Sequence, residues 1–206
     1  MTADNVLQPP RRLEKSDNRK DFSSGEPSLD IWFHRYAMQN QRARNCVVYV
    51  STWNDRVMGY YAVCTGSVEK ELAPEDFASG RPRAIPVVIL ARLAVDQRAQ
   101  GKGIGRALLR DALTRCLAGS EAIGAAAVVV HALNEEAKQF YLSAADFIEL
   151  PGSRCTLCCQ SPRSRGLCRS RRGAGLAALR EQAAPATPPR RGCPATRWRP
   201  ALRRRA

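Results

Sequence analysis

The feature that most constrains the fold of this chain is a buried strand that leads through a glycine-rich loop into a helix. Residues 87–95 form a nearly continuous apolar run rich in β-branched side chains, which predicts a strand covered on both faces. Glycine and charged residues follow from Asp96 to Gly105. From Ile104 to Leu117, apolar residues recur at helical spacing with arginines between them, which predicts an amphipathic helix.

A second strand and helix follow directly. Residues 125–132 predict another buried strand, and Glu135 to Ser143 predicts a short helix. The order strand, helix, strand implies two parallel strands joined by a right-handed crossover. A last strand over 147–150, extended by a run over 155–158, would close the sheet.

The residues before this region predict a helix, a hairpin and a loop. Apolar side chains at helical spacing predict one helix over 27–44. Two β-like runs, 46–52 and 57–65, are separated by turn-forming residues and predict a hairpin. The segment 67–86 is polar and interrupted by proline and glycine, so we expect a surface loop.

Charge divides the chain near residue 160. Residues 160–206 contain 13 Arg, no Lys and one acidic residue, a net charge of +12, so +2 of the total +14 is left for residues 1–159. We therefore expect one domain over residues 1–159 and a basic tail over 160–206. The tail has too little apolar periodicity to offset its ordering entropy and is expected to be disordered. An RNA-binding arm and a product of out-of-frame translation both fit its composition.

Targeting signals and metal motifs are not found in the sequence. No apolar run approaches the roughly 18–20 residues that a membrane-spanning helix needs, and the polar N-terminus lacks the apolar core of a signal peptide. We therefore expect a soluble, cytoplasmic protein without membrane contact. The one Cys-x-x-Cys pair has no second pair and no nearby histidine, so no metal is expected.

The glycine-rich loop predicts an anion site. Glycines at a helix start let backbone N–H groups converge, and these groups together with the helix dipole bind a phosphate or pyrophosphate. Neither a Walker P-loop nor a dinucleotide fingerprint fits the spacing. The expected site consists of Gln100, Gly101, Lys102, Gly103, Ile104, Gly105 and Arg106.

The spacing Gln100-x-x-Gly103-x-Gly105 resembles the acetyl-coenzyme A loop of the GNAT family of N-acetyltransferases. The segment from Asn134 to Tyr141 is similar to that family's later cofactor motif. The resemblance implies an α/β (α+β) GNAT fold, in which helices flank a mixed, mostly antiparallel sheet with a splayed central pair of parallel strands. It also implies acetyl-coenzyme A (acetyl-CoA) as cosubstrate.

The resemblance assigns roles to single residues. Leu93 and Val95 would offer backbone hydrogen bonds to the acetyl and pantetheine groups, and Asn134 would bind the pantetheine arm. Tyr141 would be the general acid that protonates the departing thiolate. The family usually places three residues and a glycine before the next phenylalanine, whereas here the interval to Phe147 is one residue longer and has no glycine.

The sequence leaves open which group, if any, deprotonates the substrate amine. An acidic loop could serve, a water-mediated base fits equally well, and the reaction could proceed with no base at all. The acidic loop residues are Glu69, Glu71, Glu75 and Asp76.

Four segments resemble the GNAT toxins of bacterial type II toxin–antitoxin systems: Phe22 to Trp32, Gln39 to Gln41, Gly59 to Tyr61 and Leu90 to Asp96. This resemblance implies acetylation of the amino group of aminoacyl-tRNA, which blocks translation, and neutralisation by a ribbon-helix-helix antitoxin. A homodimer is also expected from it.

A tRNA substrate needs a positive surface for its phosphates, and the candidates are Arg35, Arg42, Arg44, Arg81, Arg83, Arg92 and Arg98. Two alternatives stay open. One is a general GNAT acetyltransferase of a small amine or protein N-terminus, and the other is a non-catalytic basic RNA-binding protein or degenerate toxin.

Overall fold

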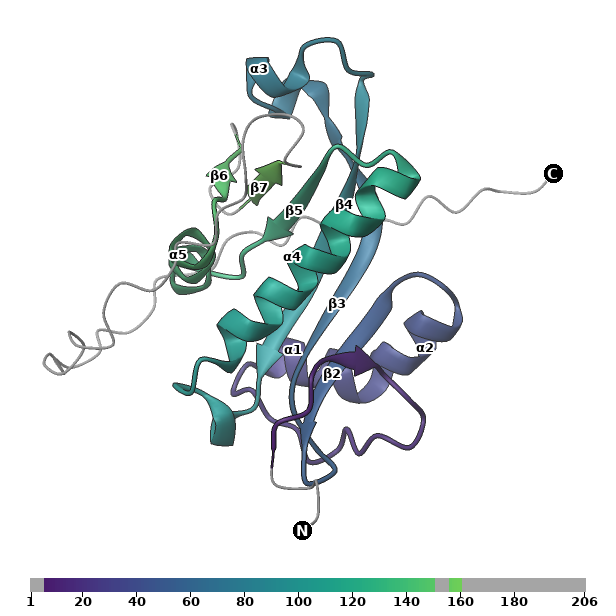
Figure 1. The fold of residues 1–206 in the computed structure, drawn as a ribbon, viewed down its shortest axis with the longest axis vertical. Coiled ribbons are helices and arrows are strands. Elements are labelled where there is room, and N and C mark those ends of the chain that lie inside the picture. The colour runs from purple at the N-terminus through teal and green to yellow at the C-terminus, as the bar shows by residue number, and fades with distance from the viewer. Residues whose placement is uncertain (1–5, 151–155, 161–206) are drawn as a thin grey trace, which may run out of the picture.

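The computed structural model describes residues 6–150 and 156–160, and a mixed sheet forms the centre of this part of the chain (Figure 1). Seven strands pair in the order β1-β2-β3-β4-β5-β7-β6. β4 and β5 are parallel, and all other neighbours are antiparallel. The strands are β1 (Arg11–Arg12), β2 (Val47–Trp53), β3 (Arg56–Glu69), β4 (Ala84–Val95), β5 (Ala127–His131), β6 (Ile148–Glu149) and β7 (Thr156–Gln160). The predicted mixed, mostly antiparallel sheet is confirmed.

Helices cover both faces of this sheet. α4 (Ile104–Ile123) and α5 (Glu135–Ala144) lie on one face, and the segment from α1 (Pro27–Ile31) to α2 (Ala37–Arg42) lies on the other (Figure 1). The alternation of side chains along a strand shows the two layers directly. Tyr60 and Tyr61 are neighbours on β3 and both are fully buried, yet Tyr60 packs under α1–α2 and Tyr61 packs under α4.

The helix predicted over 27–44 is interrupted by a π-helical stretch. α1 continues without a break into η2 (Trp32–Tyr36) and then α2, and the Ala37 N–H bonds the Trp32 carbonyl five residues back. The ring of Phe33 stacks on Tyr60 with centroids 4.1 Å apart, so contact with the sheet accompanies the wider turn. Apolar spacing predicted the helix but not this wider hydrogen-bond period.

The loop predicted over 67–86 is wrong at both ends. β3 continues to Glu69 and β4 begins at Ala84, so that Glu69 pairs with Ala84 and Ser67 pairs with Pro86. Pro86 has no N–H to donate to the sheet, but its carbonyl accepts a hydrogen bond from the Ala126 N–H at 2.8 Å. Only residues 70–83 connect the strands, through η3 (Lys70–Leu72) and α3 (Glu75–Ala78).

The strand predicted over 87–95 is also less covered than expected. β4 is buried over much of its length, but Arg92 is exposed and Leu93 and Val95 are half-buried. The helices at that end of the sheet leave part of the strand open.

Residues 161–206, which make up nearly all of the predicted tail, lie outside the described residues. Within residues 6–150 and 156–160, every helix is too short or too polar to cross a lipid bilayer.

Candidate active site

The two parallel strands separate at a β-bulge. β4 and β5 pair only from Val88↔Val128 to Leu90↔Val130, and β5 ends one residue later. At the same point the β3–β4 register shifts, because Arg92 pairs with Ala62 while Leu90 pairs with Val63, which leaves Ala91 as the extra residue. In the described part of the chain, the edge of β4 from Ala91 to Val95 therefore has no strand partner on its β5 side. Leu93 and Val95 lie on this open edge, as the predicted splay requires.

The glycine loop at the end of β4 has the backbone geometry of an anion site. Gly101 (φ 73°) and Gly103 (φ 79°) both adopt the left-handed conformation. Gly103 is the N-cap of α4 and provides no side-chain hydrogen bond to the helix. The N–H groups of the first helical turn, from Ile104 to Arg106, therefore point out of the helix without a capping partner.

The side chains of this loop have different environments. Gln100 is exposed, but its Nε2 donates to the carbonyls of Ser24 at 2.9 Å and Val95 at 3.1 Å. Lys102 and Arg106 are exposed; Lys102 bonds the Arg98 carbonyl, and Arg106 reaches Ser143 on α5 at 3.4 Å. Two cations thus flank the open helix turn, while Gln100 holds the loop in shape.

α5 packs directly against the start of α4. A Cβ added at Gly105 would lie 3.5 Å from the Phe140 ring, so the two helices approach closely here. Asn134 caps α5, with its Oδ1 accepting the Ala137 N–H at 2.8 Å, so its Nδ2 is the group that remains for a ligand. Asn134 is exposed at the start of α5.

Tyr141 of α5 is buried between two aromatic rings, those of Phe140 on the same helix and Phe147 after it. It is 7% exposed, and edge contacts join it to Phe140 at 5.3 Å and Phe147 at 5.9 Å between centroids. Burial raises its pKa well above the ordinary value for a tyrosine, so the phenol stays protonated at neutral pH. Leu93 and Val95 of the open edge pack against the same apolar cluster as Tyr141, and a protonated phenol can act as an acid.

The longer interval after Tyr141 does not displace Phe147. α5 ends at Ala144, and Ala145 then adopts an extended conformation (φ −154°) that needs no glycine. Phe147 is still 6% exposed and packs on Tyr141. The extra residue falls in the segment between the helix and β6, and Tyr141 and Phe147 still pack on each other.

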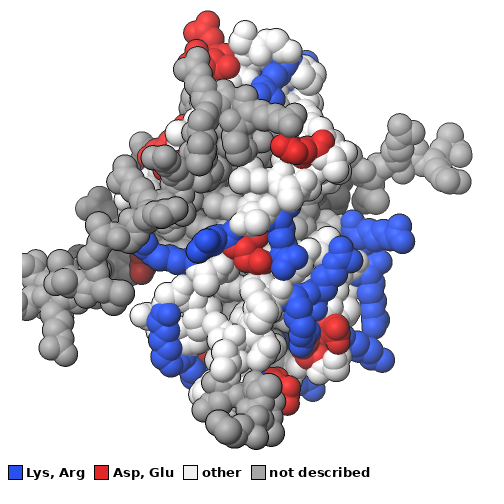
Figure 2. All heavy atoms as spheres, in the orientation of Figure 1, with Lys and Arg blue, Asp and Glu red and all other residues white. Residues whose placement is uncertain are grey.

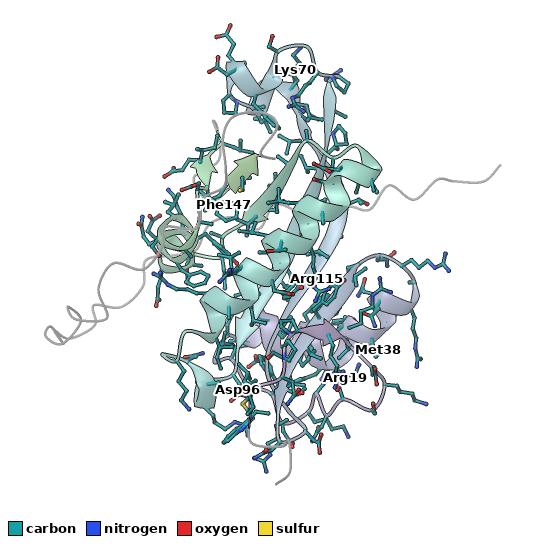
Figure 3. All side chains as sticks on the ribbon, viewed as in Figure 1. Arg19, Met38, Lys70, Asp96, Arg115 and Phe147 are labelled. Carbon is teal, nitrogen blue, oxygen red and sulfur yellow. The ribbon has the colours of Figure 1, made fainter. Side chains whose placement is uncertain are left out.

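The acidic side chains that were weighed as a base lie far from the glycine loop. Glu69, Glu71, Glu75 and Asp76 flank η3 and α3, near the start of β4. Figure 3 shows Lys70, in that region, and Asp96, beside the glycine loop, at opposite ends of the sheet. These acids therefore do not converge on the open edge of β4.

Asp96 and Arg98 form a cluster that the sequence did not reveal. Asp96 is 1% exposed and receives hydrogen bonds from Arg98 Nε (2.7 Å), Arg98 Nη2 (2.8 Å) and the Ser23 N–H (3.1 Å). Burial alone would raise the pKa of Asp96, but these hydrogen bonds outweigh it and hold the pKa below its usual value. Arg98 is thus engaged in an ion pair with Asp96. The only signal was an acid directly after a buried strand, with arginine two residues on.

The cavity between α4 and α5 is small. It encloses about 170 Å³ and lies beside the middle of α4, among Leu109, Leu113 and Ala144. Sites that enclose a small molecule usually measure roughly 300–1,000 Å³. The geometry therefore favours an extended ligand laid along the open edge of β4 and the start of α4.

Comparisons with known proteins agree with this geometry. A profile of the Acetyltransferase (GNAT) domain matches residues 44–144. The "tRNA-acetylating toxin" of Mycobacterium tuberculosis (strain ATCC 25618 / H37Rv) is 43% identical over 133 residues, which cover 65% of this chain and 80% of that protein. The "Probable toxin TacT" of Sinorhizobium fredii (strain NBRC 101917 / NGR234) is 35% identical over 131 residues, covering 60% and 72%.

Solved structures show the same relationship. AtaT complexed with acetyl-methionyl-tRNAfMet superposes with a TM-score of 0.70 at 28% identity, covering 77% of this chain and 96% of that one. A tyrosine-to-phenylalanine mutant of KacT gives a TM-score of 0.69 at 26% identity, covering 76% and 98%. The chain therefore belongs to the GNAT family of acetyltransferases, in the group that includes the tRNA-acetylating toxins.

Proposed function

We propose that this chain transfers the acetyl group of acetyl-CoA to the amino group of an aminoacyl-tRNA and so acts as a toxin that blocks translation. The observation that carries the proposal is the convergence of three parts: the uncapped first turn of α4, the open edge of β4 beyond Ala91, and the buried Tyr141. Phe140 brings the last of these against the first. The relatives named for tRNA acetylation support the choice of acceptor.

The residues present fit acetyl-CoA, which supplies an activated acetyl thioester when bound. The N–H groups of Ile104, Gly105 and Arg106 suit its pyrophosphate, with the side chains of Lys102 and Arg106 adding positive charge. The free edge of β4 at Leu93 and Val95 suits the amides of the pantetheine arm, as does the Nδ2 of Asn134. AtaT has been solved with acetyl-CoA bound, which supports this assignment.

Tyr141 is the proposed general acid. The substrate amine attacks the thioester carbon, the carbon–nitrogen bond forms and the carbon–sulfur bond breaks. Tyr141 gives its phenolic proton to the departing sulfur and regains one from solvent, while the amine releases its proton to water. The raised pKa suits this role because the proton is present on the phenol at neutral pH.

The structure sorts the arginines that were expected to bind tRNA. Arg98 is paired with Asp96, Arg83 lies 4.0 Å from Glu71, and Arg81 and Arg92 lie over the rings of Phe77 and Trp32. The remaining three candidates, Arg35, Arg42 and Arg44, are exposed and make no ion pair with another described residue. Figure 2 shows Lys and Arg side chains gathered on the right of the face viewed, where α2 lies. We assign the tRNA backbone to this side.

The proposal includes a partner. AtaT has been solved with the C-terminus of the antitoxin AtaR, and we infer that a ribbon-helix-helix antitoxin neutralises this chain in the same manner. We further infer a homodimer. Co-expression with the neighbouring gene product and light scattering of the purified chain test these two points.

The decisive experiment measures transfer of labelled acetyl from acetyl-CoA to charged tRNA by wild type and Tyr141→Phe. Loss of the proton donor should lower kcat by about 10²–10⁴-fold with little change in acetyl-CoA affinity. The matched control is Tyr49→Phe, a tyrosine on β2 stacked on Tyr61, which should keep wild-type kcat.

The outcomes separate the alternatives. Turnover with a peptide N-terminus or a small amine, and none with charged tRNA, would support a general acetyltransferase. If the wild type binds acetyl-CoA but turns over none of these acceptors, the proposal that the chain is an enzyme is wrong.

A further inference from the structure

The segment Asp21–Ser24 lies between the glycine loop and α1 and bonds to both. On the loop side, the Ser23 N–H donates to Asp96 at 3.1 Å, and the Ser23 carbonyl accepts the Gln97 N–H at 2.8 Å. Arg98 Nη2 bonds the Asp21 carbonyl at 2.9 Å. These contacts join residues more than 70 positions apart in the sequence.

The same segment is held from the other side by α1. Asp30 accepts hydrogen bonds from the Ser24 N–H at 2.8 Å, the Ser24 Oγ at 2.6 Å and the Ser23 Oγ at 3.1 Å. Gln100 adds a bond to the Ser24 carbonyl. Two serines are therefore held between a carboxylate on the helix and a carboxylate at the loop.

Beyond Asp30, the helix reaches the open edge of β4. Trp32 begins the π-helical stretch, and the Arg92 guanidinium lies 5.6 Å from the centre of its ring. Arg92 directly follows the bulge at which β4 and β5 separate. A continuous path of hydrogen bonds and packing thus runs from the glycine loop to the helix that covers the other face of the sheet.

We propose that Asp96 and Asp30 are positioning residues that couple the acetyl-CoA loop to the helix on the acceptor side, through Ser23 and Ser24. The inference rests on the proposed function for the identity of the two ligands. Asp96 and Asp30 touch neither ligand in this proposal. They fix the relative position of the surfaces that do.

The physical reason is pre-organisation. A loop already held in its binding conformation loses less conformational freedom when the ligand arrives. If Asp30 no longer holds Ser24, the backbone that supports Gln97 and Gln100 becomes looser, and acetyl-CoA affinity falls although Asp30 is not in the loop. The same bonds support the helix from the loop side, so loss of those bonds at the loop should also loosen the helix and weaken acceptor binding.

The first test removes the helix end of the path. Asp30→Ala should raise the Kd of acetyl-CoA, measured by isothermal titration calorimetry without any acceptor, by roughly fivefold. The matched control is Ser28→Ala on the same helix, whose hydroxyl makes no hydrogen bond to another described residue and which should change the Kd by less than about twofold. Because no acceptor is present, this result does not depend on whether aminoacyl-tRNA is the substrate. An unchanged Kd for Asp30→Ala would overturn the coupling.

The second test removes the loop end. Arg98→Gln should raise the KM for aminoacyl-tRNA at least about fivefold while kcat falls less. The slope of log KM against log salt should equal that of wild type, because Arg98 is not expected to contact a phosphate. Arg56→Gln, an exposed arginine at the start of β3 that is not among the tRNA candidates, is the matched control.

A smaller salt slope for Arg98→Gln would identify a direct phosphate contact and contradict the positioning role. An unchanged KM would also contradict it. If charged tRNA is not turned over at all, the proposed function fails while the acetyl-CoA titration of Asp30→Ala still decides the coupling.

Discussion

At the residue scale, burial sets the chemistry of the two most important side chains. Tyr141 is a tyrosine whose pKa is raised because its ring is enclosed by Phe140, Phe147 and the sheet. Asp96 is just as buried but keeps its charge, because Arg98 and a backbone N–H solvate it. Burial therefore favours the neutral form of both acids, and only Asp96 has the hydrogen bonds that keep it ionised.

The raised pKa of Tyr141 predicts the pH profile of the reaction. The acid form must be present for proton donation, and its loss would begin near pH 10 for an ordinary tyrosine. With the pKa raised, kcat/KM should rise with pH as the substrate amine loses its proton and then stay level up to about pH 10. Initial rates corrected for ester hydrolysis of the substrate would show this. A fall in rate below about pH 9 would contradict the assignment of Tyr141 as the acid.

Substitution of Gly103 should weaken acetyl-CoA binding, whereas substitution of another glycine on α4 should not. The φ of Gly103, 79°, is in the left-handed region, and nothing lies within 4 Å of an added Cβ. Gly103→Ala should therefore cost about 1–2 kcal/mol of conformational energy without a clash, and acetyl-CoA should bind more weakly. Gly119→Ala, inside α4 with equally open space, should instead stabilise the helix by about 0.5–1 kcal/mol. Equal effects of the two substitutions on acetyl-CoA binding would count against a special role for Gly103.

At the element scale, α4 is seated on β3 through a glycine. A Cβ at Gly59 would lie 2.6 Å from Leu108 Cδ1 and 3.2 Å from the Ala94 carbonyl oxygen. Leu108 is fully buried, so little space is available for it to move. This close contact fixes the height of α4, and hence of the glycine loop, above the sheet.

Gly59→Ala should destabilise the fold by about 1–3 kcal/mol through overpacking, measured by urea unfolding. If the Leu108 contact is the cause, adding Leu108→Val should recover part of the loss, so that the double variant is more stable than the sum of the single effects. Purely additive losses would show that the Ala94 carbonyl is the limiting contact.

At the scale of the whole molecule, positive charge is concentrated at the C-terminal end of the sequence. Residues 160–206 carry +12 of the net +14. The site residues from Leu93 to Tyr141 all lie in the described part of the chain. Acetyl-CoA binding and electrostatic attraction of tRNA should therefore be separable by truncation.

A chain ending at Gln160 should bind acetyl-CoA within about twofold of the full chain but show a shallower salt dependence of tRNA binding. Each phosphate that the shortened chain no longer neutralises lowers the log–log slope by roughly 0.7–0.9. Filter binding at several salt concentrations measures this slope. A large loss of acetyl-CoA affinity would place the domain boundary beyond residue 160.

The sequence by itself determined the strand, glycine loop and helix, since their signals are local. β-branched runs, helical spacing and glycines at a helix start act over a few residues, so they predicted β4 and α4 and the position of the loop between them. The same locality explains the errors. The ends of β3 and β4 depend on partners elsewhere in the chain.

Only the tertiary structure decided how the site is assembled. The bulge at Ala91, the burial of Tyr141, and the link from Asp96 through Ser23 to Asp30 all arise from residues distant in sequence. It also decided which arginines are engaged and which are exposed, because a charge gives no sign of its partner until the fold supplies one. Local propensities fixed the elements, whereas long-range packing fixed the distances between them, and the proposed chemistry depends on those distances.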